Sequence, residues 1–400
     1  MIVVESFRGR PVTDLGVEVV ERKGTGHPDT LCDSMMEAIS VALCREYLRE
    51  FGAVLHHNID KGLLAAGQVE KGFGGGRILR PMELTIGDRA TFSAAGKTIP
   101  VAEIAVETAR AWLKRHLRHV DPLHHLDTRV MLAPGSAELT DIFARPGAVR
   151  AANDTSAAIG YWPPSPTERA VLELEHHLNS PAFKTRFPET GEDVKVMGLR
   201  HGDALELTVA MPLLAAHIDS EAAYFARKAT VGHAMEEFAR HFTAFKEITI
   251  RHNALDAPGR GQGGVYLSLL GTSAEDADSG QVGRGNRVNG IIALNRPLGA
   301  EAVAGKNPVS HVGKIYNVLA HRLAREIQEN IAGIREAYVL LLSRIGDPVD
   351  RPWMASAQLL LEDGVDLDDV RAPIERKIEQ ALAGMDAFCA ELSAGKYPVC

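Results

Sequence analysis

Apolar and polar positions follow two periodicities along this chain, one typical of helices and one typical of strands. Apolar side chains recur at helical spacing through residues 28–51, with Pro28 in the first turn. The same spacing predicts helices over residues 101–117, 221–242, 311–331 and 370–392. Alternation or short apolar runs predict extended segments at residues 17–20, 54–57, 82–86, 194–199, 204–210, 248–250, 265–270 and 337–342. Strand and helix patterns therefore alternate over the whole length.

Short local motifs predict three further features. Ser165 and Glu168 flank Pro166 in the spacing of a capping box, which predicts a helix start. Residues 201–203 separate two strand patterns and predict a hairpin turn. Residues 253–264 are rich in glycine and polar residues, so we expect a mobile loop there.

This alternation predicts an α/β fold, in the broader sense an α+β fold, with three similar subdomains. Each subdomain is expected to be a sheet covered by helices. The approximate boundaries are residues 1–135, 136–260 and 261–400, with interleaving between them allowed. No sequence identity between the three parts is visible, so an internal repeat is a hypothesis only.

Composition narrows the class of protein. The 400 residues suffice for two or three domains with their own cores. A net charge of −8 argues against a general nucleic-acid binder. The four cysteines have no metal-binding or disulfide-dense spacing, and no stretch is long and apolar enough for a membrane span. The N-terminus lacks the apolar core of a signal peptide, so we expect a cytoplasmic protein.

Residues 21–29 place several charged and polar side chains at a predicted helix N-terminus. Arginine, lysine, two glycines, histidine and aspartate stand there in the order Glu-Arg-Lys-Gly-Thr-Gly-His-Pro-Asp. Free backbone N–H groups and the helix dipole favour an anion at such a position, so the segment predicts a phosphate site. An ordinary helix start, with His27 on the surface and Asp29 favourable in the first turn, explains the segment about as well on its own.

Further polar segments recur along the chain. Residues 56–62, 192–195, 271–290 and 305–308 contain carboxylates that can hold magnesium and cations that can neutralise phosphate oxygens. Taken singly, each has a plain alternative: the adjacent histidines can be a satisfied strand end, and Asp193 with Lys195 can be a surface ion pair. Residues 259–264 have the spacing of a dinucleotide fingerprint, but no helix follows the glycines, and no Walker motif is present.

Together these segments make the chain resemble the S-adenosylmethionine synthetase (methionine adenosyltransferase) family, in its archaeal-type branch. The matching stretches occur in order over most of the chain, at residues 21–33, 56–62, 73–76, 153–156, 191–198, 271–290 and 305–317. The resemblance implies transfer of the adenosyl group of ATP to methionine sulfur, followed by cleavage of the triphosphate into diphosphate and phosphate.

The resemblance also implies roles for individual residues. The family's histidine at the ATP phosphates corresponds to His27, and its magnesium ligand corresponds to Asp29. The other catalytic positions near the polyphosphate correspond to Lys195, Arg284 and Lys306. The positions expected to bind ATP or substrate are Gly135, Ser136, Asp154, Asp193 and Asp278.

The same resemblance implies Mg²⁺ as cofactor, with K⁺ as a further candidate. ATP and L-methionine are the implied partners, with no nucleic acid and no membrane, in a homodimer or dimer of dimers with active sites between subunits. The apolar residues 265–270 are compatible with burial in such an interface or within one subunit.

Some positions depart from the bacterial and eukaryotic pattern. Thr30 and Gly285 stand where those relatives have lysines, and a second lysine near Ser310 is missing. Arg287 and Lys314 are candidate replacements.

Two other functions stay open. The first is an ATP-dependent phosphotransferase or phosphohydrolase that uses the same cationic pocket. The second is a silent nucleotide-binding paralogue, although such a protein would not need to keep all five of the cations and carboxylates at His27, Asp29, Lys195, Arg284 and Lys306.

Overall fold

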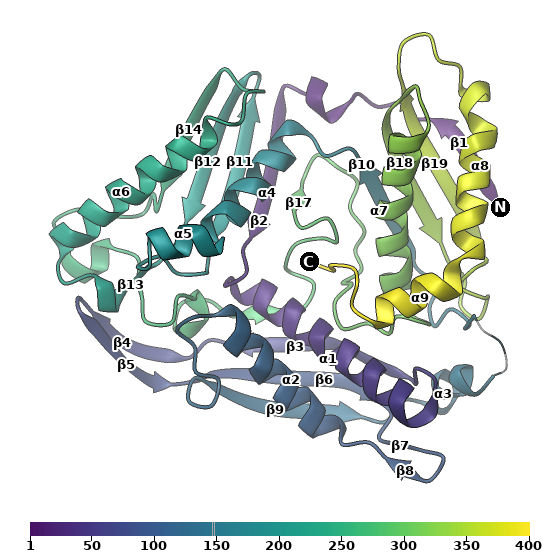
Figure 1. The fold of residues 1–400 in the computed structure, drawn as a ribbon, viewed down its shortest axis with the longest axis horizontal. Coiled ribbons are helices and arrows are strands. Elements are labelled where there is room, and N and C mark those ends of the chain that lie inside the picture. The colour runs from purple at the N-terminus through teal and green to yellow at the C-terminus, as the bar shows by residue number, and fades with distance from the viewer. Residues whose placement is uncertain (146, 148) are drawn as a thin grey trace.

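Three mixed sheets, each covered on one face by helices, surround the centre of the molecule (Figure 1). The computed structural model describes residues 1–145, 147 and 149–400. This arrangement is the α/β class with three subdomains that the sequence predicts. Within the described residues, none of the helices has the length and apolar content that a membrane crossing requires.

The first sheet has the order β16-β3-β6-β9 and carries helices α1 and α2 on one face. Its elements are β3 (His57–Ala65), β6 (Met82–Ala90), β9 (Leu126–Ala133), β16 (Gly280–Gln281), α1 (Pro28–Phe51) and α2 (Val101–His116). Buried apolar side chains of α1, such as Leu31, Met35 and Leu43, pack against the sheet. This is the helical stripe that the sequence pattern predicts.

The second sheet has the order β14-β12-β11-β2-β17. Its elements and covering helices are β2 (Val17–Lys23), β11 (Lys195–His201), β12 (Ala204–Ala210), β14 (Glu247–His252), β17 (Ile292–Ala293), α4 (Pro166–Leu178), α5 (Pro181–Arg186) and α6 (Glu221–Ala239). The predicted hairpin is confirmed, because β11 and β12 pair antiparallel with His201 opposite Ala204. The capping box is also confirmed: Glu168 N–H donates to Ser165 Oγ over 3.0 Å, and Ser165 N–H donates to Glu168 Oε2 over 2.7 Å.

The third sheet has the order β1-β19-β18-β10. Its elements and covering helices are β1 (Ile2–Ser6), β10 (Ala157–Trp162), β18 (Ile334–Leu342), β19 (Met354–Leu361), α7 (Val312–Asn330), α8 (Leu367–Ala383) and α9 (Met385–Ser393). Smaller elements are α3 (Ala137–Ala144) and the strand pairs β4 (Gln68–Gly72) with β5 (Gly75–Arg80), β7 (Ser93–Ala94) with β8 (Lys97–Thr98), and β13 (Leu213–Leu214) with β15 (Leu267–Ser268).

The three sheets do not follow the linear boundaries 1–135, 136–260 and 261–400. β1 pairs with β19 in the third sheet, and β2 lies between β11 and β17 in the second. β16 returns from the last part of the chain to pair with β3 in the first sheet. Each unit is therefore interleaved with the others.

Several predicted elements differ from the structure in extent, among them the segments 54–57, 265–270 and 370–392. The segment 54–57 becomes a strand only at His57, because the carbonyls of Leu55 and His56 accept bonds from the side chains of Asn307 and Thr91. The predicted strand 265–270 shrinks to β15, since the N–H groups of Leu269 and Leu270 donate to the Glu275 carboxylate. The predicted helix 370–392 is divided at Gly384, between α8 and α9.

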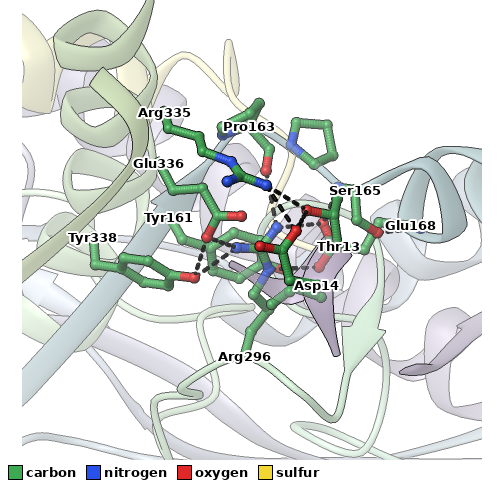
Figure 2. A network of polar contacts seen from close by, with 12 residues as sticks. Thr13, Asp14, Tyr161, Pro163, Ser165, Glu168, Arg296, Arg335, Glu336 and Tyr338 are labelled. Carbon is green, nitrogen blue, oxygen red and sulfur yellow. Dashed lines mark hydrogen bonds and ion pairs between the residues drawn. The ribbon is translucent and has the colours of Figure 1, made fainter. Parts of the chain in front are cut away.

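A buried ionic network joins the second and third units (Figure 2). Arg296 donates to Glu168 of α4 over 2.8 Å and to Glu336 of β18 over 3.0 Å. It also donates to the Tyr338 hydroxyl and to the carbonyl of Pro163. The Arg296 side chain is only 1 % exposed, so this junction is fixed by charge-assisted hydrogen bonds in a dry interior.

Candidate functional site

The candidate site is built where β2 ends and α1 begins. His27 is the N-cap of α1: its Nδ1 accepts the backbone N–H of Asp29 over 3.2 Å, and Pro28 is the first helical residue. Gly26 lies so close to the backbone of Glu192 that a Cβ atom has no room, and its N–H donates to the Glu192 carbonyl over 2.9 Å. The predicted helix start is confirmed, and α1 presents its N-terminus to a polar cluster.

Two lysines on neighbouring strands face this N-terminus. Lys23 at the end of β2 forms a 2.8 Å ion pair with Asp29 Oδ2, while Lys195 at the start of β11 forms a 2.9 Å pair with Glu21. The two lysines are direct cross-strand partners. The other oxygen of Asp29 accepts the backbone N–H of Gln281 over 2.9 Å. Positive charge is thus concentrated beside the end of the helix that favours an anion.

Asp193 completes the buried part of this cluster. Its Oδ2 accepts hydrogen bonds from both the backbone N–H and the hydroxyl of Ser273. Burial raises the pKa of the Asp193 carboxyl to about 7, and the nearby negative charge of Asp278 acts in the same direction. A cation bound beside the Asp193 carboxylate would favour its charged form.

The pKa of His27 is lowered to about 4, chiefly by burial. The imidazole is therefore neutral at pH 7. Because Nδ1 accepts a backbone hydrogen bond, the ring proton resides on Nε2, which makes Nε2–H a donor.

The segment 278–284, which includes β16, brings Asp278 and Arg284 to the same region. Asp278 is exposed, and its charge acts on both Asp193 and His27. Arg284 has an exposed side chain, and its backbone carbonyl accepts from Lys23 Nζ. Six of the residues that the sequence singles out therefore lie in one cluster in the structure: His27, Asp29, Asp193, Lys195, Asp278 and Arg284.

Lys306 lies outside this cluster. It is buried in a second group, 2.6 Å from Asp60 Oδ2 and 3.3 Å from Glu301 Oε2. The neighbouring Gly305 N–H donates to Glu37 of α1 over 2.8 Å. Because Glu37 follows Asp29 by eight residues, the two groups are roughly 12 Å apart along the axis of α1.

The candidate replacement cation Lys314 also belongs to the second group. Its Nζ donates to both oxygens of Glu37 over 2.8 and 2.7 Å, and the side chain is fully buried. Arg287 lies instead near Asp33. Burial raises the pKa of the Asp33 carboxyl, and the charge of Arg287 offsets part of this rise.

Gly135, Ser136 and Asp154 lie near the second group as well. Gly135 packs directly on the imidazole of His56, and Ser136 is the N-cap of α3. Asp154 is exposed, and its Oδ1 accepts the N–H of Thr155. The residue before it, Asn153, lines a small cavity of about 80 Å³, whose other lining residues include His56, Asn58, Asp88, Asn307, Leu139 and Phe143.

The sequence pattern did not single out the role of Asp33 and Glu37. Asp29, Asp33 and Glu37 follow one another at intervals of four, so they share one face of α1. Each accepts a backbone N–H, from Gln281, Gly283 and Gly305 in turn. This spacing of acids within a predicted helix is the signal that could have identified them. Burial raises the pKa of Asp33 to about 7.

No group of three or more His, Cys, Asp or Glu side chains in the described part of the chain is arranged as a metal cage. The cluster at the N-terminus of α1 instead combines cations with separated carboxylates. Such an arrangement suits a polyphosphate that brings its own divalent ion, since Mg²⁺ is usually held by one or two carboxylates plus substrate phosphates.

Comparisons with known proteins agree on one family. The sequence profile of the family described as "S-adenosylmethionine synthetase (AdoMet synthetase)" matches residues 1–396. The chain is 43 % identical over 387 residues to the "Probable S-adenosylmethionine synthase" of Aquifex aeolicus, covering 96 % of both chains. It is 44 % identical over 365 residues to the S-adenosylmethionine synthase of Pyrococcus furiosus, covering 91 % of this chain and 90 % of the relative.

A solved structure supports the fold. The chain is similar to a structure described as an unusual S-adenosylmethionine synthetase from Campylobacter jejuni, with a TM-score of 0.58 and 15 % identity. The similarity covers 95 % of this chain and 94 % of the other.

Proposed function

Because this chain belongs to the S-adenosylmethionine synthetase family, we propose that it makes S-adenosylmethionine at the cluster around the N-terminus of α1. The enzyme is a methionine adenosyltransferase, which joins the adenosyl group of ATP to methionine sulfur. The observation that carries the placement of the site is the convergence of Lys23, Lys195 and His27 on one helix N-terminus.

The reaction needs positioned cations more than it needs a base. A thioether sulfur has no proton to lose, so its attack on the ribose 5′ carbon requires alignment of sulfur, carbon and leaving oxygen. Negative charge then grows on the departing triphosphate. Lys23 and Lys195 are proposed to exchange their present carboxylate partners for triphosphate oxygens, while His27 donates its Nε2–H. Arg284 is proposed to contact the same anion from the exposed loop.

The same cations can serve the second step. Hydrolysis of the triphosphate into diphosphate and phosphate again requires charge stabilisation on phosphate oxygens and an oriented water. Apart from the water that is consumed, no further group has to enter the site between the two steps.

Mg²⁺ is the proposed metal, with K⁺ as a further candidate. The donors fit a hard cation, because Asp29, Asp193 and Asp278 supply only carboxylate oxygens near the proposed phosphate position. The pKa of Asp193, raised chiefly by burial and further by Asp278, also fits, since a bound cation would favour the charged form of this carboxylate. When bound, the metal would neutralise phosphate charge, and Asp29 is the proposed ligand.

The second group is proposed to serve nucleotide and substrate binding. Lys306 lies beside Glu37, near the middle of α1 and roughly 12 Å along the helix axis from the phosphate cluster. Gly135, Ser136 and Asp154 lie near the same second group. We therefore infer a homodimer, alone or as a pair of dimers, in which the two groups of facing chains form one active site. This arrangement is isologous, so the same surface of both subunits would be used twice.

The open sheet faces support that dimer. They expose large apolar side chains at Leu63 of β3, Met131 of β9 and Leu199 of β11, which are between 42 % and 55 % exposed. The segment 265–270 does not contribute, because Leu267 and Leu270 are buried within their own chain.

Two other features support a cytoplasmic enzyme without nucleic-acid partners. All four cysteines are free thiols, as a reducing compartment favours. The net charge of −8 also opposes general attraction to nucleic acid.

Incubation with ATP, L-methionine and Mg²⁺, followed by mass detection of products, tests the function. We expect S-adenosylmethionine, phosphate and diphosphate in equal amounts. Phosphate release without methionine would favour the phosphotransferase or phosphohydrolase alternative. Binding of ATP with no product would favour a silent paralogue.

A further inference from the structure

Residues 188–192 lead into Asp193, and each of their carbonyls accepts a hydrogen bond from another part of the chain. The carbonyl of Glu189 accepts the N–H of Leu214, and that of Glu192 accepts the N–H of Gly26. The remaining carbonyls between residues 188 and 192 accept bonds from two cationic side chains, Lys184 and Arg118. Such complete use of acceptors is unusual for a connecting segment, which normally bonds to water.

Lys184, at the end of α5, supplies one of these contacts. Its Nζ donates to the Gly191 carbonyl over 2.6 Å and to the Thr190 hydroxyl over 3.3 Å. The residue is 6 % exposed, and burial lowers the pKa of the Lys184 ammonium to about 7. Burying a lysine whose hydrogen-bond acceptors are neutral costs free energy, which the nearby charges of Glu192 and Glu175 offset only in part.

Arg118 supplies the other contacts from a different unit of the fold. It follows α2 of the first unit, yet its guanidinium donates to the Glu192 carboxylate and to the carbonyls of Thr190 and Pro188. The planar fork of arginine suits such multiple acceptors at fixed directions. The segment is thereby tied to the layer that carries α1.

These contacts are transmitted to the candidate site through the backbone. Gly26, which precedes His27, donates to the Glu192 carbonyl, and Asp193 N–H donates to the Gly271 carbonyl over 2.9 Å. A shift of the segment would therefore move Asp193 and the turn before His27 together.

We infer that Lys184 and Arg118 are positioning residues, which hold Asp193 and the turn before His27 in register with each other. This inference rests on the proposed function, because it assigns both residues to the geometry of that site. Neither side chain needs to touch substrate for this role.

The test uses full-length Lys184→Met and Arg118→Met variants, with Arg118→Lys as the conservative change. Lys246→Met and Arg251→Met are matched controls, because both cations form exposed ion pairs in the second unit, with Asp203 and Glu206. We expect kcat to fall by about 10- to 100-fold in both Met variants, as a misplacement of roughly 1 Å would cause, with a much smaller change in the KM for methionine. Arg118→Lys should fall between wild type and Arg118→Met.

Native-state hydrogen exchange gives a second readout that does not depend on activity. The amides of Gly26 and Asp193 should exchange faster in both Met variants than in the controls, while the amides of β18 stay protected. Unchanged exchange at these two amides would overturn the inference. So would normal kcat in variants whose exchange has increased, and so would a loss of activity that is accounted for entirely by global unfolding. If the wild-type protein forms no S-adenosylmethionine, the proposed function fails, and the exchange result still decides whether the two cations hold the segment.

Discussion

Lys195 and Lys23 lie directly opposite each other on the antiparallel strands β11 and β2. Like charges at such a position destabilise a sheet, and each lysine here is compensated by a separate carboxylate. A polyphosphate bound between them would remove the repulsion. The two adjacent positive charges therefore favour binding of a polyphosphate, the ligand that the proposed reaction requires.

Lys195→Ala should lower kcat by roughly 100-fold or more, because loss of one contact to a developing oxyanion typically costs that much. The KM for methionine should change much less. The melting temperature of the ligand-free protein should change little, since the variant removes one of two opposed cations and also the ion-pair partner of Glu21. Steady-state kinetics and calorimetry check both parts, with Lys246→Ala as the exposed control. Near-normal turnover would remove Lys195 from the mechanism.

His27 has two separable roles, and two substitutions divide them. His27→Ala should lose the N-cap bond to Asp29, at a cost of about 1 kcal/mol in the free energy of unfolding, and should also lose turnover. His27→Asn should keep the cap, because asparagine is a favoured N-cap residue, while turnover stays low. Denaturant titration and kcat measurements test this. If His27→Asn restored turnover, the imidazole Nε2–H would have no role in catalysis.

Arg296→Met should destabilise the junction between the second and third units. The change leaves Glu168 and Glu336 buried without their cation, so we expect a loss of about 3 kcal/mol or more in the free energy of unfolding. The control is Arg344→Met, which removes an exposed pair with Asp347. Both variants should keep normal kcat below their unfolding temperature. A loss under about 1 kcal/mol, the value of an exposed pair, would contradict the assigned role of the network.

Acid should destabilise the protein in part through His57. Burial lowers the pKa of His57 from 6.5 to about 3, so the folded state binds fewer protons than the unfolded state between these values. The contribution of His57 to the free energy of unfolding is fully present above pH 6.5. It declines as the pH falls toward 3, and the loss reaches about 2 kcal/mol at pH 5.

The His57→Gln variant should therefore show a shallower decline of unfolding free energy between pH 6.5 and pH 5 than wild type. His124→Gln is the control, because His124 is 76 % exposed. Parallel curves for wild type and His57→Gln would contradict the prediction.

Features encoded by a few neighbouring residues were predictable from the sequence. The capping box of Ser165 and Glu168, the hairpin around residues 201–203 and the start of α1 at Pro28 all depend on local backbone chemistry. By contrast, β1 and β10 were missed, because their partners lie far along the chain and their own patterns are short.

The site shows the same division. His27 and Asp29 were found because they belong to one continuous motif, and the family resemblance extended the set to Lys195. Lys306 has a recognisable motif, but sequence order does not say which part of α1 it lies beside. Lys184 and Arg118 left no signal, because isolated cations in unrelated segments look like ordinary surface residues until the fold places them on the same carbonyls.

The parallel pairing of β1 with β19 has a consequence for biosynthesis. Ile2 finds its partner Ala355 only after almost the whole chain has left the ribosome. Until then the third sheet lacks its edge strand, and the first residues of the nascent protein have no place to pack. Closing so long a loop is entropically costly and slow. A polypeptide that stops before β19 therefore leaves its N-terminal strand unpaired, and such unpaired segments are accessible to proteases and chaperones.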